Sequence, residues 1–237
     1  MKHKIITFGE LMLRLSPDNN ERFTQAHSYE AVYGGGEANT AVSLANFNVD
    51  TRYVTKLPKH TIGQSAVNSL RQYGVDVSRI VRGGDQIGIY FLEKKTSQRP
   101  TNVIYNRNGS AFALATKEDF DWDSIFDGAT WFHFSGITPA ISDNMAEITI
   151  EACKEAKKRG ITVSCDLNYR SKLWSSEKAN KVMSEVCRYV DICIANEDDA
   201  VGIFGMDASK SDKEKNAYIA EELTKMFPNF KMVASVW

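Results

Sequence analysis

The chain has 237 residues, 43% of them hydrophobic and 25% charged, which is typical of a globular protein with a sizeable core. With 29 basic and 30 acidic residues its formal charge is -1, so no global field favours nucleic acid or an anionic membrane surface. Because there is no secretory signal core, no membrane-length apolar stretch, no C-x-x-C pair and no histidine cluster, we expect a cytoplasmic protein with reduced thiols and no structural metal.

Short apolar runs alternate with longer amphipathic segments along most of the chain. The first course predicts a strand, a helix, a strand and a helix over residues 5–9, 37–47, 51–55 and 62–73. The second course predicts strands and helices in turn over residues 131–135, 145–159, 161–166, 178–189 and 191–195. Gly74 and Gly160 follow helices as closing residues, and 230–236 reads as a last strand. This alternation predicts an α/β fold around a mostly parallel sheet.

Two regions, at about 11–33 and 86–107, contain strand-like runs with no helix between them. Side chains alternate along both regions, so that each strand has two distinct faces. We expect these strands to form a small separate sheet, inserted into a single domain that spans 1–237. One of its faces is available to cover a site, and the other to meet a partner subunit.

The first polar motif is Gly34-Gly35-Gly36-Glu37-Ala38-Asn39, at the start of a predicted helix. Consecutive glycines let the backbone approach a ligand, and the helix start presents unpaired N–H groups at its positive end. The motif is neither G-x-G-x-x-G nor a P-loop. It predicts a polar or anionic ligand, but a tight turn into a buried helix explains the spacing equally well.

Tyr105 and Arg107 share one residue parity on one strand-like run and Tyr90 lies on the run before it, so the three can project from comparable faces. A guanidinium binds a carboxylate through two parallel hydrogen bonds, and phenols donate to hydroxyls without carrying charge. The trio therefore suits an acidic sugar. Aromatic residues on strands also pack against one another, and that alternative stays open.

Two further motifs follow predicted strands, at the carboxyl edge where open α/β sheets bind ligands. They are Asp166-Leu167-Asn168-Tyr169-Arg170 and Asn196-Glu197-Asp198-Asp199. An ion pair between Asp166 and Arg170 is the structural alternative for the first motif. Capping of the next helix is the structural alternative for the second.

In this order the motifs resemble the ribokinase-like (PfkB) carbohydrate kinases, and among these the 2-keto-3-deoxygluconate kinases. G-G-G-E-A-N-T-A-V-S-L-A-N at 34–46 is similar to the N-terminal signature of the family. G-I-Y-F at 88–91 and V-I-Y-N-R at 103–107 look like lid motifs, and D-x-N-x-R also recurs in these kinases. With similar stretches at 1–10 and 135–139, the resemblance covers nearly the whole chain. It implies a ribokinase-like three-layer fold with a β-sheet lid. Asn48 replaces the usual glycine after the first helix, which a left-handed helix end tolerates.

The resemblance also implies roles for individual residues. The substrate contacts it implies are Gly35, Asn39, Tyr90, Tyr105, Arg107 and Arg170. The two arginines would hold the carboxylate of 2-keto-3-deoxygluconate, whose terminal hydroxyl is phosphorylated by ATP and Mg²⁺. Asn168 and Asn196 would lie near nucleotide phosphate, and Asp199, one methylene shorter than the usual glutamate, would act on magnesium through water. Lid strands of this kind also imply a homodimer.

No catalytic residue is assigned, because the family's G-A-G-D motif, which carries the catalytic aspartate, is absent from the sequence. We therefore expect this chain to correspond to the N-terminal two-thirds of such a kinase, without the C-terminal nucleotide-binding part, and to have negligible turnover. We also expect an exposed edge of the sheet, which lowers stability or favours association. One alternative is a kinase for a neutral sugar, of the fructokinase or ribokinase type, which has little need for two arginines. The other is a non-catalytic protein that binds a sugar acid or pairs with another subunit.

Overall fold

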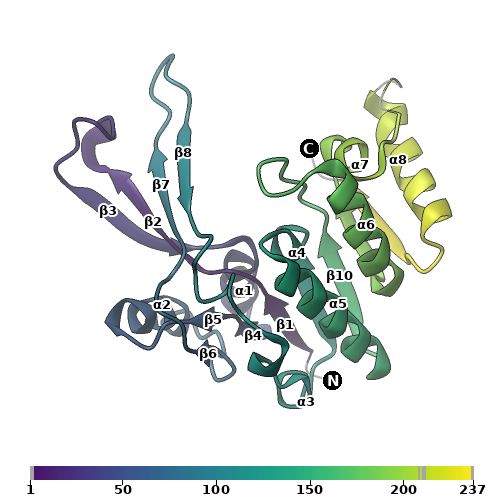
Figure 1. The fold of residues 1–237 in the computed structure, drawn as a ribbon. Coiled ribbons are helices and arrows are strands. Elements are labelled where there is room, and N and C mark those ends of the chain that lie inside the picture. The colour runs from purple at the N-terminus through teal and green to yellow at the C-terminus, as the bar shows by residue number, and fades with distance from the viewer. Residues whose placement is uncertain (1–2, 208, 210–211, 236–237) are drawn as a thin grey trace.

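The computed structural model describes residues 3–207, 209 and 212–235, and Figure 1 shows its two main sheets. The larger sheet has six parallel strands in the order β12-β11-β10-β9-β1-β4. They are β1 (Lys4–Phe8), β4 (Asp50–Val54), β9 (Trp131–Ser135), β10 (Thr162–Asp166), β11 (Ile192–Ala195) and β12 (Met232–Ser235). Since all six run the same way, their carboxyl ends lie along one edge of this main sheet.

Helices follow most of these strands, as the alternation predicts. The α-helices are α1 (Gly36–Asn46), α2 (Thr61–Arg71), α3 (Trp122–Ile125), α4 (Ile137–Ala140), α5 (Asp143–Lys158), α6 (Ser176–Val186), α7 (Glu197–Phe204) and α8 (Asp212–Met226). Short 3₁₀ turns occupy Asp18–Asn20, Lys117–Asp119 and Cys187–Tyr189. No helix in the described part of the chain combines the length and apolar character needed to cross a membrane.

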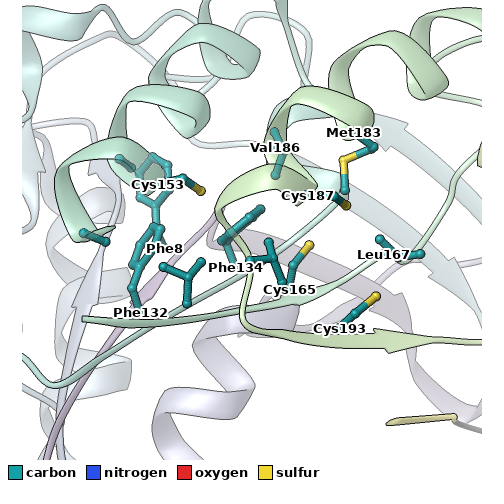
Figure 2. Packing of buried hydrophobic residues seen from close by; sticks show 14 of the residues in the cluster. Phe8, Phe132, Phe134, Cys153, Cys165, Leu167, Met183, Val186, Cys187 and Cys193 are labelled. Atoms are coloured by element: carbon teal, nitrogen blue, oxygen red, sulfur yellow. The ribbon is translucent and has the colours of Figure 1, made fainter. Parts of the chain in front are cut away.

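The larger core cluster lies between the main sheet and α5 and α6. Phe8 from β1 meets the rings of Phe112, Phe120 and Trp122 edge to face, with centroids 5.2 to 5.5 Å apart. The four cysteines are free and buried, and Figure 2 shows them in this same cluster. Burial raises the pKa of these thiols, so they act here as small apolar side chains.

The two helix-free regions come together in one sheet of four strands, here called the lid sheet (Figure 1). Its strands are β2 (Met12–Pro17), β3 (Tyr29–Gly34), β7 (Ile89–Glu93) and β8 (Asn102–Asn106), in the order β3-β2-β7-β8. The β2–β7 pair is parallel and the outer pairs are antiparallel. A two-stranded ladder of β5 (Lys56–Leu57) and β6 (Val81–Arg82) lies apart from it.

The observed elements confirm the predicted α/β class, and most boundaries differ by one or two residues. Asn48 takes the left-handed conformation with φ 59°, and Gly160 does the same with φ 67°. The helix predicted to reach residue 189 ends at Val186, because the chain tightens into a 3₁₀ turn closed by Val190 N–H on Cys187 O. The last strand begins at Met232 rather than at 230, and residue 236 lies outside the described range.

Candidate functional site

A cavity of about 670 Å³ lies between lid strand β8 and the loop that follows β10. Its described lining includes three cationic side chains, Arg107, Arg170 and Lys172, and neither aspartate nor glutamate. Tyr105 lines the same cavity from the lid. A concave site with a few convergent polar groups is the usual form of a small-molecule site. The structure therefore brings together three predicted site residues from segments more than sixty residues apart.

The tyrosine pair of the lid lies as the strand parity predicts. Tyr90 on β7 is the register partner of Tyr105 on β8, and their rings stack with centroids 5.8 Å apart. The guanidinium of Arg107 lies 5.8 Å from the centre of the Tyr105 ring, within the range of a cation–π contact. Tyr105 borders the cavity directly and Tyr90 packs against it, so the aromatic cluster that the packing alternative predicts also forms part of the cavity wall.

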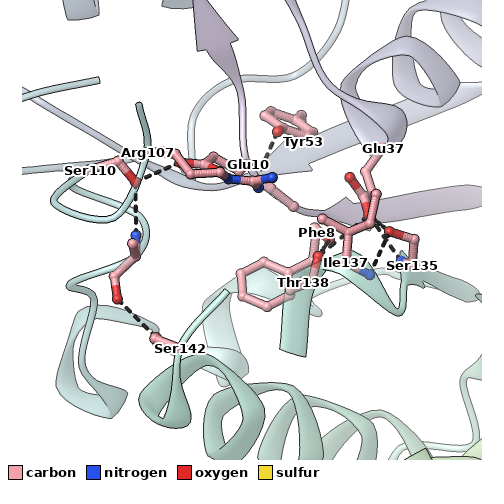
Figure 3. A network of polar contacts seen from close by, with 12 residues as sticks. Phe8, Glu10, Glu37, Tyr53, Arg107, Ser110, Ser135, Ile137, Thr138 and Ser142 are labelled. Atoms are coloured by element: carbon pink, nitrogen blue, oxygen red, sulfur yellow. Dashed lines mark hydrogen bonds and ion pairs between the residues drawn. The ribbon is translucent and has the colours of Figure 1, made fainter. Parts of the chain in front are cut away.

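Arg107 is buried and already paired. Its Nε donates to Oε2 of Glu10 at 2.7 Å, and a second guanidinium nitrogen forms an ion pair with the same oxygen. Ser110 donates through Oγ to the other carboxylate oxygen at 2.5 Å, as Figure 3 shows. Burial raises the pKa of Glu10 although the guanidinium works in the opposite direction. The sequence reasoning missed Glu10, whose position directly after the first strand was the available signal.

The glycine run forms the start of α1. Gly35 is its N-cap, and a Cβ atom there would lie only 2.2 Å from the main-chain oxygen of Glu10, so the close approach requires glycine. Asn39 is exposed and borders a second cavity of about 440 Å³, together with Gly34. The Tyr90 hydroxyl and the Asn39 amide both lie near Gly34. Gly35 and Asn39 do not border the cavity of the arginines.

Glu37, in the first turn of α1, is a second buried carboxylate that the sequence reasoning did not single out. Its Oε1 accepts hydrogen bonds from Ser135 N at 3.0 Å, Ser135 Oγ at 2.5 Å and Thr138 Oγ1 at 3.4 Å (Figure 3). Burial raises its pKa above the ordinary range. These bonds join the start of α1 to the carboxyl end of β9. The glycine motif is thus tied to the same edge of the main sheet as the motifs after β10 and β11.

Asp166 and Asn168 lie side by side at the end of β10. Asn168 has a left-handed backbone with φ 40°, and its Nδ2 donates to Asp166 Oδ2 at 3.4 Å. Burial, and then the negative charge of Asp199, raise the pKa of Asp166 to about 6. No ion pair joins Asp166 to Arg170 within the described ranges, so that alternative for the motif is not realised.

Asn196 and Asp199 form a capping box at the start of α7. The Asp199 N–H donates to Asn196 Oδ1 at 2.8 Å, and the Asn196 N–H donates to Asp199 Oδ2 at 3.0 Å. Tyr169 N–H occupies the other carboxylate oxygen of Asp199 at 2.6 Å. The capping role is therefore present, whereas the nucleotide and magnesium roles stay predictions. No group of three His, Cys, Asp or Glu side chains in the described residues could hold a metal ion.

Comparison with known proteins gives one family. The model for pfkB family carbohydrate kinases matches residues 2–229. A 2-dehydro-3-deoxygalactonokinase of Haloferax volcanii is 37% identical over 209 residues, which are 87% of this chain and 65% of that protein. A 2-dehydro-3-deoxygluconokinase of Bacillus subtilis is 29% identical over 179 residues, which are 75% of this chain and 55% of that protein. The chain thus spans less than two thirds of the length of these relatives.

The same relationship holds in three dimensions. The crystal structure of a 2-dehydro-3-deoxygluconokinase from Thermotoga maritima superposes with a TM-score of 0.95 at 49% identity. The match covers 99% of this chain and 71% of that structure, and it includes both the main sheet and the smaller sheet. Since the family model covers nearly the whole sequence and the fold agrees over nearly its whole length, the chain belongs to the pfkB family of carbohydrate kinases.

Proposed function

We propose that this chain binds an acidic keto sugar of the 2-keto-3-deoxygluconate type in the cavity between lid and main sheet. The observation that carries the proposal is the cationic lining of that cavity, to which no described acidic side chain contributes. Arg107 is compensated by Glu10. The side chains of Arg170 and Lys172 form no ion pair or hydrogen bond with any described residue, and the charge of Arg170 acts only at longer range on the Asp199 carboxyl, so both side chains can pair with an anionic ligand.

The tyrosines and Arg107 would form hydrogen bonds of defined direction with the sugar, without adding net charge to the site. A phenol at Tyr105 can donate to a sugar hydroxyl, and the fixed guanidinium beside it offers donors in a planar fork. A neutral sugar would gain nothing from the positive charges of Arg170 and Lys172, whereas a carboxylate can form charge-assisted hydrogen bonds with them. An acidic sugar is therefore the better fit to this lining.

We further propose that the sugar is phosphorylated in a kinase of family length, with ATP and Mg²⁺ supplying the transferred group. The support is family membership and the relatives named 2-dehydro-3-deoxygalactonokinase and 2-dehydro-3-deoxygluconokinase. Another relative in fold, a sugar kinase from Pyrococcus horikoshii, was solved in complex with ATP. Asn168 and Asn196 remain the candidates of this chain for contacts to nucleotide phosphate. The described residues alone do not form a magnesium centre, and Asp199 would reach the ion only through water.

Calorimetric titration of this chain with 2-keto-3-deoxygluconate and with fructose tests the binding proposal. We expect the acid to bind and fructose to bind at least about tenfold more weakly, the worth of one charge-assisted hydrogen bond. Arg170→Ala should weaken acid binding by a similar factor. Arg188→Ala, which removes an exposed arginine far from the cavity lining, is the matched control and should change nothing. Equal affinity for the two sugars, or an unchanged affinity of the Arg170 variant, would refute the proposal.

A further inference from the structure

Four segments join the lid sheet to the rest of the molecule, and Glu10 contacts or belongs to each of them. It lies in the first segment, between β1 and β2. In the second, a Cβ atom on Gly35 would be 2.2 Å from its main-chain oxygen, and in the third a Cβ atom on Gly88 would be 2.6 Å from its Oε1. In the fourth, which follows β8, Arg107 and Ser110 donate to its carboxylate. One residue therefore meets the four connections, through its side chain at the third and fourth and through its main chain at the second.

The contacts continue from Glu10 to a helix of the main domain. Ser110 Oγ, which donates to Glu10, also accepts the N–H of Ala113 at 3.1 Å. The carbonyl of Ala113 accepts a hydrogen bond from Ser142 Oγ at 2.9 Å, and Ser142 is the N-cap of α5. Figure 3 shows this line of contacts from Arg107 to Ser142. The guanidinium at the cavity is thus connected to α5 in the main domain. The four connections between the lid sheet and the main domain are here called the hinge.

The energetics of the pair favour a geometric role over a simple contribution to stability. The side chains of Glu10 and Arg107 are only 2% and 7% exposed. In such a pair the desolvation of both ions offsets most of their attraction, and an apolar pair of similar shape often stabilises a fold as well. What an apolar pair cannot provide is a fixed direction for the guanidinium fork.

We propose that Glu10 is a positioning residue, which fixes the lid sheet on the main domain and thereby holds the Arg107 guanidinium at the cavity. The carboxylate of Glu10 binds the connection that follows β8. Its main-chain oxygen lies where Gly35 leaves space, and its side chain lies where Gly88 leaves space. The part of this inference that concerns ligand binding rests on the proposed function. The part that concerns the lid does not.

Hydrogen–deuterium exchange of the unliganded chain tests the lid part. Glu10→Gln keeps the shape of the side chain and removes its charge. Glu93→Gln is the matched control, because Glu93 also forms a lid ion pair, with Arg99 at 3.5 Å, and its side chain is only 11% exposed. The control pair lies at the end of β7 away from the hinge.

We expect Glu10→Gln to accelerate exchange by about tenfold or more in all four connections together, the effect of losing one charge-assisted hydrogen bond. Exchange in α5 and β10 should stay as in the wild type. Glu93→Gln should accelerate only the segment around 93–99. Unchanged exchange at the connections would overturn the proposal, and so would equal acceleration throughout the chain, because that would mean a purely global loss of stability.

Calorimetry with 2-keto-3-deoxygluconate tests the ligand part on the same variants. Glu10→Gln should weaken binding by about tenfold or more, because the guanidinium is no longer held, and Glu93→Gln should bind as the wild type does. A loosened lid that binds the acid with unchanged affinity would refute the positioning role. If the wild type itself fails to bind the acid while exchange changes as expected, the proposed function is wrong and the hinge role of Glu10 stands.

Ser110→Ala provides a second variant in case Glu10→Gln does not fold. It removes one of the two groups that bind the carboxylate without leaving an uncompensated charge. The same four connections should exchange faster, by a smaller factor than in the Glu10 variant. Wild-type exchange in this variant would count against the network, since in the described part of the chain Ser110 is the step that joins Glu10 to Ala113 and α5.

Discussion

Asp166 lies at the carboxyl end of β10, where burial and the nearby carboxylate of Asp199 raise its pKa from an ordinary 3.8 to about 6. Asp166 is still mostly ionised at neutral pH, but its ionisation destabilises the folded chain relative to the unfolded chain. Asparagine has nearly the same shape and keeps an oxygen that can accept the hydrogen bond from Asn168. We expect Asp166→Asn to stabilise the fold at pH 7.

The magnitude follows from the shift. Each unit of pKa corresponds to about 1.4 kcal/mol, so a rise from 3.8 to about 6 would give about 3 kcal/mol for a fully buried group. Asp166 is only partly buried and solvent screens its charge, which reduces the expected gain to about 1 to 2 kcal/mol. For a chain of this size, that corresponds to a rise in Tm of roughly 2 to 8 °C.

The sign of the pH dependence is fixed by linkage. Between about pH 4 and pH 6 the folded chain holds a proton on Asp166 that the unfolded chain has released, so stability falls as pH rises through this window. The variant cannot titrate there. Its advantage over the wild type should be full above pH 6 and vanish below about pH 4.

Urea denaturation of both proteins from pH 3.5 to 8, in buffer without divalent cations, measures this difference. The wild-type curve should decline relative to that of the variant as pH rises from 4 to 6. A variant that is less stable than the wild type at pH 7, or a difference that does not depend on pH, would refute the reasoning. The first result would mean that the Asp166 carboxylate is stabilised by its surroundings rather than penalised.

Asp191→Asn should have the opposite sign, because contacts from Lys157 at 2.8 Å and Lys231 at 3.1 Å, among others, hold the pKa of this carboxyl below its ordinary value. The partners are partly exposed, so we expect the variant to be less stable than the wild type by about 1 to 3 kcal/mol at pH 7. This difference in stability should disappear as pH falls below about 4, and denaturation midpoints across pH measure it. Arg107→Met should lower stability by about 3 to 5 kcal/mol, because it leaves the Glu10 carboxylate buried without its cation. Adding Glu10→Gln should recover much of that loss in melting experiments, and no recovery would mean that lost packing is the cause.

The elements were predictable from the sequence because their signals are local. Strands of the main sheet read as short apolar runs, and Asn48 and Gly160 mark helix ends through the left-handed backbone that each adopts. The stacking of Tyr90 on Tyr105 also follows from local parity, once the two strands are paired.

The organisation of the site was less predictable because its contacts are not local. Glu10 lies 97 positions before Arg107, and no periodic pattern connects them. The sequence predicted that Arg107 and Arg170 together hold the carboxylate of the sugar. It gave no sign that the Glu10 carboxylate neutralises the charge of Arg107. Asn39, in the first turn of α1, borders a different cavity from the one that Arg107 and Arg170 line, and no local pattern in the sequence separates the two cavities.

The two arginines of the site therefore differ in their chemistry. Arg107 is buried, compensated by Glu10 and aimed by it, so it offers hydrogen bonds of defined direction with little net charge. Arg170 is exposed and its side chain forms no hydrogen bond or ion pair with a described residue, so it offers charge with little fixed direction. On the proposed function, discrimination between acidic and neutral sugars should depend mainly on Arg170 and should weaken with salt. The orientation of a bound sugar should depend mainly on Arg107 and the Glu10 carboxylate that pairs with it, and salt should affect it much less because that pair is buried.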